Sequence, residues 1–178
     1  MRVIDNAMPG FADFQAQVMA PGFPWHYARA TKPGDEGVNP WLYGWVHLVF
    51  DNGQWFSHHH DLFMNAISQM FVALNEPVKG IHRIRMVLNT LTDQPYLNGA
   101  HVDLLIPHKT ALLYVNDADG DTLLYQERWR EGYDGPYAEA HRIAPAANRL
   151  VLFDGLTFHT GTTPVKTPRR VVMNINYE

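Results

Sequence analysis

Beyond Gly80 the chain is divided into short apolar runs that turn-forming residues separate. Each run is long enough for a strand but too short for an ordinary helix, and Gly, Asn and Asp dominate the turns. Regular spacing of this kind is typical of antiparallel sandwiches and barrels. The runs cover residues 81–91, 100–106, 110–116, 121–127, 139–143, 149–153 and 170–177. We therefore expect a jelly-roll core from about residue 81 to residue 178.

The first 80 residues have a different pattern. A short amphipathic helix is predicted within residues 1–20, where Phe11, Phe14 and Val18 fall on one face. A longer helix is predicted over residues 61–75, because its apolar residues recur at helical spacing. The Pro- and Gly-rich segment 21–40 is predicted to be a loop, and the aromatic segment 41–50 a strand.

These two parts together predict one domain over residues 1–178. The hydrophobic share of 46% and the charged share of 18% are those of a globular chain, and 178 residues are enough for one domain. The predicted fold class is α+β, mainly β. We expect a double-stranded β-helix (jelly roll) over about residues 81–178, with helices from the helical and loop part, about residues 1–80, packed on one sheet.

Composition excludes some functions. The formal net charge of -4 gives no basic surface, so binding to nucleic acid is not expected. The chain has no cysteine, so a metal would have to be held by histidines and carboxylates. No segment has the charged start and apolar run of a signal peptide, and none is apolar for long enough to span a membrane. We expect a cytoplasmic protein, and the sequence does not indicate its oligomeric state.

One His-x-Asp motif is a candidate metal site. In a strand over residues 100–106, His101 and Asp103 would point to the same face, since positions two apart do so. His159, which follows the apolar run at 149–153, is the best candidate for a third ligand. Two histidines and one carboxylate form the facial arrangement that leaves positions open on non-haem iron.

A second His-x-Asp motif, formed by His59 and Asp61, lies at the start of the predicted helix 61–75. Residues two apart on a helix do not share a face, so we interpret this pair as a solvated helix start. With ten histidines in the chain, a lone His-x-Asp is a weak signal. The sequence around the motif therefore decides its interpretation.

The last predicted strand supplies that context, because its two faces differ in polarity. One face carries Arg170, Val172, Asn174 and Asn176, and the other carries Val171, Met173, Ile175 and Tyr177. We expect the apolar face to pack against the helices and the polar face to line a wet cavity. Arg170 would then point inside, where a guanidinium can bind a carboxylate through two hydrogen bonds. Arg169 would point to the other face and is the weaker candidate.

These residues resemble the 2-oxoglutarate/Fe(II) oxygenases, and within them the prolyl-hydroxylase-like branch. The order in that family is His-x-Asp, a distal His and then a basic residue some ten positions further on. Here these are His101, Asp103, His159 and Arg170. The resemblance is strong over about residues 84–177 and looser before them, where the chain is similar to small oxygenases of phage and marine bacteria.

The resemblance implies a set of ligands and a reaction. Fe(II), 2-oxoglutarate and O2 would be used together, with the iron on the two histidines and Asp103. Arg170 and Tyr114 would bind the distal carboxylate of 2-oxoglutarate, and Asn89 and Tyr96 could line its pocket. The expected reaction is hydroxylation of a peptidyl prolyl group or of a small molecule.

Substrate specificity in this fold is expected in the loops around the barrel mouth. We hypothesise that the aromatic, Gly- and Pro-rich loops at residues 21–40 and 128–138 close over the substrate, with Tyr133 and Tyr137 in the second loop.

Two other classes of protein remain as alternatives. A cupin-like metalloprotein of another reaction type would usually use three histidines, with or without a glutamate, so the carboxylate at Asp103 argues against it. A non-catalytic jelly-roll binding module predicts that His101, Asp103 and His159 do not converge. An oxygenase fold without activity is not excluded by the sequence.

Overall fold

The computed structural model describes residues 1–29 and 40–178. In chain order the elements are β1 (Arg2–Ile4), α1 (Phe11–Val18), β2 (His26–Ala28), β3 (Gly44–Asp51), β4 (Gln54–Trp55), α2 (His60–Ala73), β5 (Ile81–Thr90), β6 (Lys109–Tyr114), β7 (Thr122–Arg128), β8 (Glu139–Ile143), β9 (Leu150–Asp154), β10 (Thr157–Gly161) and β11 (Arg169–Tyr177). The large sheet has the order β1-β9-β6-β11-β5-β3-β2, with β4 paired to β3, and the small sheet has the order β10-β7-β8. All of these pairs are antiparallel. This is the predicted α+β, mainly β architecture with a jelly-roll core.

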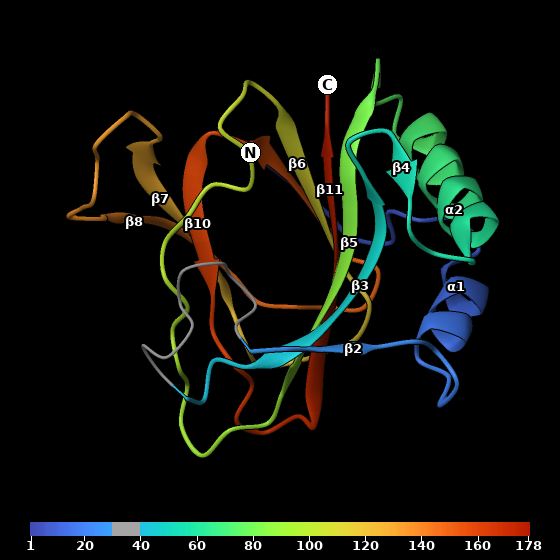
Figure 1. Cartoon of the computed structure of the whole chain (residues 1–178), viewed down its shortest axis with the longest axis horizontal. Helices are drawn as coiled ribbons and strands as arrows, with labels where there is room; N and C mark the ends of the chain where they lie inside the picture. Colours follow the sequence, from blue (N-terminus) through green and yellow to red (C-terminus); the bar gives the residue numbers. More distant parts are fainter. Residues whose placement is uncertain (30–39) are drawn as a thin grey trace.

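The molecule has three layers (Figure 1). Helices α1 and α2 lie on one side of the large sheet, and the small sheet lies on its other side. Apolar side chains from the helices and from the near face of the large sheet form the main core. A second cluster lies between the two sheets and includes Val87, Leu112, Leu124 and Val172. The predicted packing of N-terminal helices on one sheet is therefore confirmed.

Strand β11 lies in the middle of the large sheet, between β6 and β5. Val171, Met173, Ile175 and Tyr177 are fully buried in the core beneath the helices. The alternate residues face the small sheet, where Val172 joins the second cluster. The polarity predicted for the two faces of this strand is confirmed.

Some elements differ from the prediction. β1 and β2 lie in segments predicted as helix and loop, and with three residues each they are too short to show a period. The predicted strand over residues 100–106 is wrong, because only a single bridge from His101 to His159 forms there. The apolar side chains of Leu105 and Ile106 in that run are exposed, so burial does not hold the segment in a sheet. No helix in residues 1–29 or 40–178 is long and apolar enough to cross a membrane.

Replacing Ile175 by Ala should destabilise the fold by about 2–5 kcal/mol, because it leaves a cavity between the large sheet and the helices. Val72 is a matched control, since it lies on α2 with 79% of its surface exposed. Val72→Ala should change the free energy of unfolding by less than about 0.5 kcal/mol. Urea unfolding of both variants measures the difference, and equal losses would show that Ile175 is not a core residue.

Candidate metal centre

A cavity that is partly open to solvent lies between the two sheets. Strands β5, β6 and β11 of the large sheet form one wall, and β7 and β10 of the small sheet form the other. The lining residues are Arg85, Val87, Asn89, Asn98, His101, Leu112, Thr122, His159, Thr160, Gly161, Arg170, Val172 and Asn174. The cavity thus contains two of the predicted metal ligands and the predicted inward arginine.

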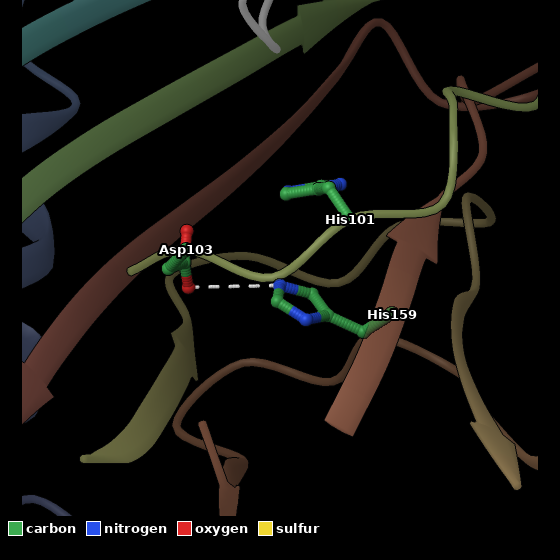
Figure 2. Close-up of side chains that lie close together, drawn as sticks. All are labelled: His101, Asp103 and His159. Atoms are coloured by element: carbon green, nitrogen blue, oxygen red, sulfur yellow. Dashed lines mark ion pairs between the residues drawn. The ribbon is translucent and has the colours of Figure 1, made fainter. Parts of the chain in front are cut away.

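His101, Asp103 and His159 converge beside this cavity (Figure 2). Each offers one ligand atom, and these atoms all lie within 4.8 Å of one another. His159 is on β10, and its backbone pairs with that of His101 through two hydrogen bonds of 2.9 and 3.0 Å. This bridge brings the two imidazoles together, and their ring centroids are 4.6 Å apart. Asp103 follows two residues later, with its Oδ2 atom 3.6 Å from Nε2 of His159.

Both histidines are oriented by backbone carbonyl groups. Nδ1 of His101 lies 2.9 Å from the carbonyl oxygen of Gly99, and Nδ1 of His159 lies 3.3 Å from that of Thr157. A carbonyl oxygen only accepts hydrogen bonds, so the proton of each neutral ring is on Nδ1. The lone pair of each Nε2 then faces the centre, as in histidines that bind a metal.

The imidazoles are held in their neutral form. Burial and the neighbouring His159 together lower the pKa of His101 to about 4. Burial also lowers the pKa of His159, against the attraction of Asp103, which raises it. Neutral imidazole is the form that binds a metal. The contact between His159 and Asp103 is therefore not an ion pair at neutral pH.

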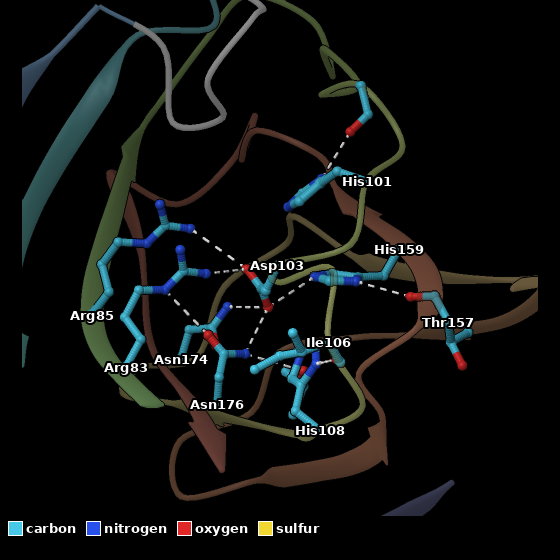
Figure 3. A network of polar contacts seen from close by, with 12 residues as sticks. Arg83, Arg85, His101, Asp103, Ile106, His108, Thr157, His159, Asn174 and Asn176 are labelled. Carbon is cyan, nitrogen blue, oxygen red and sulfur yellow. Dashed lines mark hydrogen bonds and ion pairs between the residues drawn. The ribbon is translucent and has the colours of Figure 1, made fainter. Parts of the chain in front are cut away.

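Asp103 stays ionised although its side chain is only 1% exposed. Burial alone would raise its pKa, but His159, Arg83, His101 and Arg85 together lower the pKa well below its usual range. Figure 3 shows the contacts around its carboxylate. Arg83 donates to Oδ1 at 2.8 Å, and Asn174 and Asn176 each donate to Oδ2 at 3.0 Å.

Arg170 is buried in the cavity at a distance from this network. Its Nε donates to the carbonyl oxygen of Gly120 at 2.6 Å, and its Nη2 donates to the hydroxyl of Thr122 at 2.7 Å. Tyr114 donates to the same hydroxyl at 2.7 Å, and the Arg170 guanidinium lies 5.6 Å from the centre of the Tyr114 ring. Asn89 pairs with Arg170 across the strands and lines the cavity.

The structure does not bring every predicted ligand-binding residue to the cavity. Tyr114 is fully buried beside Arg170 and does not line the cavity wall. Tyr96 lies outside the cavity, where its ring stacks on Trp41 at 6.2 Å. Arg169 is exposed and lies on the opposite side of β11 from the cavity, next to Asn116. Neither position supports a role for Tyr96 or Arg169 in binding 2-oxoglutarate.

The structure describes one of the two predicted substrate loops in full and the other only in part. Tyr133 and Tyr137 pack on Phe158, and they join a cluster with Tyr125 instead of lining the cavity. Their position does not support the proposed closure of that loop over the cavity. In the other loop, residues 30–39 lie outside the described residues.

Sequence reasoning missed the two arginines on β5. Arg83 and Arg85 lie on the same face of that strand as Asn89, opposite Asn176 and Asn174 on β11. The signal was present, because alternate residues of the run share a face as they do in β11. Thr122, which accepts from Arg170, had no signal because it becomes adjacent only when the two sheets face each other.

Comparison with known proteins places this geometry in a fold family. No protein-family profile and no curated protein matches the chain. Solved structures do: a 2OG-Fe(II) oxygenase family oxidoreductase from Burkholderia pseudomallei has a TM-score of 0.60 at 15% identity, over 96% of this chain and 91% of that one. The chain has the fold of the 2-oxoglutarate/Fe(II) oxygenases. This agrees with the resemblance found in the sequence.

Two further structures of this fold differ in what they do. A prolyl hydroxylase from Trichoplax adhaerens, in complex with a hypoxia inducible factor peptide fragment, has a TM-score of 0.61 at 14% identity, over 99% of this chain and 82% of that one. The epimerase SnoN of nogalamycin biosynthesis, an alpha-ketoglutarate-dependent non-haem enzyme, has a TM-score of 0.64 at 11% identity, over 98% and 76%. The fold therefore supports more than one reaction.

Gly120→Ala should displace Arg170. A Cβ atom at this position would lie 2.5 Å from the carbonyl oxygen of Thr162 and 2.8 Å from Cδ of Arg170, so the backbone or the arginine must move. We expect a loss of about 1–3 kcal/mol in the free energy of unfolding, from overpacking. Gly22→Ala is the control, because nothing lies within 4 Å of its Cβ position. Thermal unfolding distinguishes them, and a Gly120→Ala variant as stable as the control would contradict this packing.

Proposed function

We propose that this protein is an Fe(II)- and 2-oxoglutarate-dependent oxygenase whose iron ligands are His101, Asp103 and His159. One observation carries the proposal: two neutral imidazoles and one ionised carboxylate converge beside a cavity that also contains a buried arginine. Two nitrogens and one oxygen suit Fe(II) and leave coordination positions free for other ligands. The fold shared with oxygenases of this kind supports the same function.

The cavity suits a dicarboxylic keto acid. Arg170 would bind the distal carboxylate of 2-oxoglutarate, since its guanidinium is fixed in orientation by Gly120 and Thr122. Asn89 would add a donor there, because its Nδ2 is buried and has no hydrogen-bond partner among the described residues. Tyr114 would act indirectly, by holding the Thr122 hydroxyl that orients Arg170.

Other residues around the site orient the metal-binding side chains and limit the access of water to the cavity. Iron with 2-oxoglutarate and O2 supplies the oxidising chemistry when they are bound. Asn174 and Asn176 fix the carboxylate of Asp103, while Gly99 and Thr157 fix the two rings. The apolar side chains of Val87, Leu112 and Val172 form the cavity wall and reduce the water near the centre.

Hydroxylation is the reaction we propose, with a peptidyl prolyl group or a small molecule as the substrate class. Prolyl hydroxylases share the fold, among them one from Pseudomonas putida. The two alternatives have less support. A binding module predicts that the three ligands do not converge, and here their ligand atoms lie within 4.8 Å. A cupin-type site of three histidines is less favoured, because the buried third ligand is the carboxylate of Asp103.

Anaerobic titration of the metal-free protein with Fe(II) and then 2-oxoglutarate should produce the weak visible charge-transfer band of a keto acid chelated to iron. His101→Ala should abolish the band, since only two ligands remain to hold the iron. Absorption spectroscopy under argon measures this, with circular dichroism to verify that the variant is folded. Iron binding without a band would favour the cupin-type alternative, and no metal binding would favour a binding module.

Arg170→Met should weaken 2-oxoglutarate binding by at least about tenfold while iron affinity changes less than about twofold. The neighbouring Arg169 is a matched control with the same charge on the opposite side of the strand. Arg169→Met should leave both affinities unchanged. Calorimetric titration of 2-oxoglutarate into the iron-loaded proteins under argon measures both effects. Equal weakening in the two variants would mean that overall charge, and not Arg170, determines binding.

A further inference from the structure

Arg85 is a cation in the cavity that is only weakly paired. It lies on β5 and lines the cavity, and its one ion pair within residues 1–29 and 40–178 is a long contact of 3.9 Å from Nη2 to Oδ1 of Asp103. Its Nε atom is buried without a hydrogen-bond partner among the described residues. Arg83, two residues earlier, donates to Asp103 at 2.8 Å and to Asn176 at 3.2 Å. The single negative charge of Asp103 is thus already paired with Arg83.

The charged residues that line the cavity are both cations. Of the lining residues, Arg85 and Arg170 are the two that are permanently charged, and no Asp or Glu lines the cavity. A guanidinium kept from water without a partner is costly, so a cavity of this kind favours anionic ligands. Under the proposed function, 2-oxoglutarate brings two carboxylates. Arg170 would bind the distal one and the metal would bind the other, so that neither needs Arg85.

The position of Arg85 also separates it from the end of the cavity at Arg170. Arg85 pairs with Asn174 across the strands, and Asn89 pairs with Arg170. Four residues of a strand separate Arg85 from Asn89, which corresponds to about 13 Å. Arg85 is partly exposed, whereas Arg170 is buried. Figure 3 shows Arg85 reaching from β5 toward Asp103, on the side opposite His159.

We propose that Arg85 binds a carboxylate group of the primary substrate beside the metal, and that the substrate is therefore a small carboxylic acid. This rests on the proposed function, because it assigns the second ligand of that site. The guanidinium would donate a side-by-side pair of hydrogen bonds to the acid, one of them from Nε, which has no hydrogen-bond partner among the described residues. A substrate of this class differs from an internal prolyl residue, which brings no carboxylate of its own.

Acetate and acetamide are matched probes for this site, since they differ in charge but little in shape. The protein would be loaded with Zn(II), which does not react with O2, and saturated with 2-oxoglutarate. Saturation-transfer NMR on the probe's methyl protons then reports binding without turnover. We expect acetate to bind to the wild-type protein at least about tenfold more tightly than acetamide.

Three variants test whether Arg85 itself is responsible for the binding of acetate. Arg85→Met should weaken acetate binding by at least about tenfold and leave the affinities for Zn(II) and 2-oxoglutarate within about threefold of wild type. Arg128→Met is the charge-matched control, because Arg128 is an exposed residue paired with Asp154, and it should bind acetate normally. Arg85→Lys keeps the charge and should retain part of the acetate binding, which tests the proposal if Arg85→Met is unstable.

Two results would overturn the proposal. Loss of 2-oxoglutarate affinity in Arg85→Met with acetate binding unchanged would assign Arg85 to the cosubstrate. Unchanged binding of both would make Arg85 a structural partner of Asp103. The proposed function is tested separately, by the affinity of the wild-type protein for 2-oxoglutarate. If that affinity is absent, acetate binding to the Zn(II)-loaded protein still decides whether Arg85 is an anion site.

Discussion

The buried carboxylate of Asp103 is the constraint on which the rest of the centre depends. An ionised carboxylate that is 1% exposed requires several donors, because burial alone favours its neutral form. Those donors come from two neighbouring strands, with Arg83 on β5 and Asn174 and Asn176 on β11. The pairing of these strands therefore determines whether the carboxylate is available to a metal, although Asp103 itself lies outside both sheets.

The alternation of apolar and polar residues along β11 gives the strand two different faces. One face packs Met173 and Ile175 under the helices, and the other presents Asn174 to Asp103 and Arg170 to the far end of the cavity. A shift of one residue in register would exchange these faces, burying the polar groups under the helices. Stability and site geometry are thus coupled, since the apolar contacts that fix the register also place the cavity residues.

A feature could be predicted from the sequence when the residues that determine it are close together in the chain. The faces of β11 were predictable because alternation is local, and the convergence of His101 and His159 was suggested by type and order of residues. The strand assigned to residues 100–106 was wrong, because side-chain contacts to Asp103 replace a backbone ladder there. The stacking of Tyr96 on Trp41 had no local signal either, because it depends on a contact distant in sequence.

The charges around the cavity would link the binding of a metal ion to the binding of an anionic ligand. Arg83 already offsets the charge of Asp103, so a divalent ion entering this centre would meet two neutral imidazoles and Arg85, whose contact with Asp103 is long. Repulsion of that kind is reduced when an anionic ligand enters with the metal, since like charges in a poorly solvated cavity interact strongly. Under the proposed function, the site would therefore favour binding of the metal together with carboxylate ligands over binding of the metal alone.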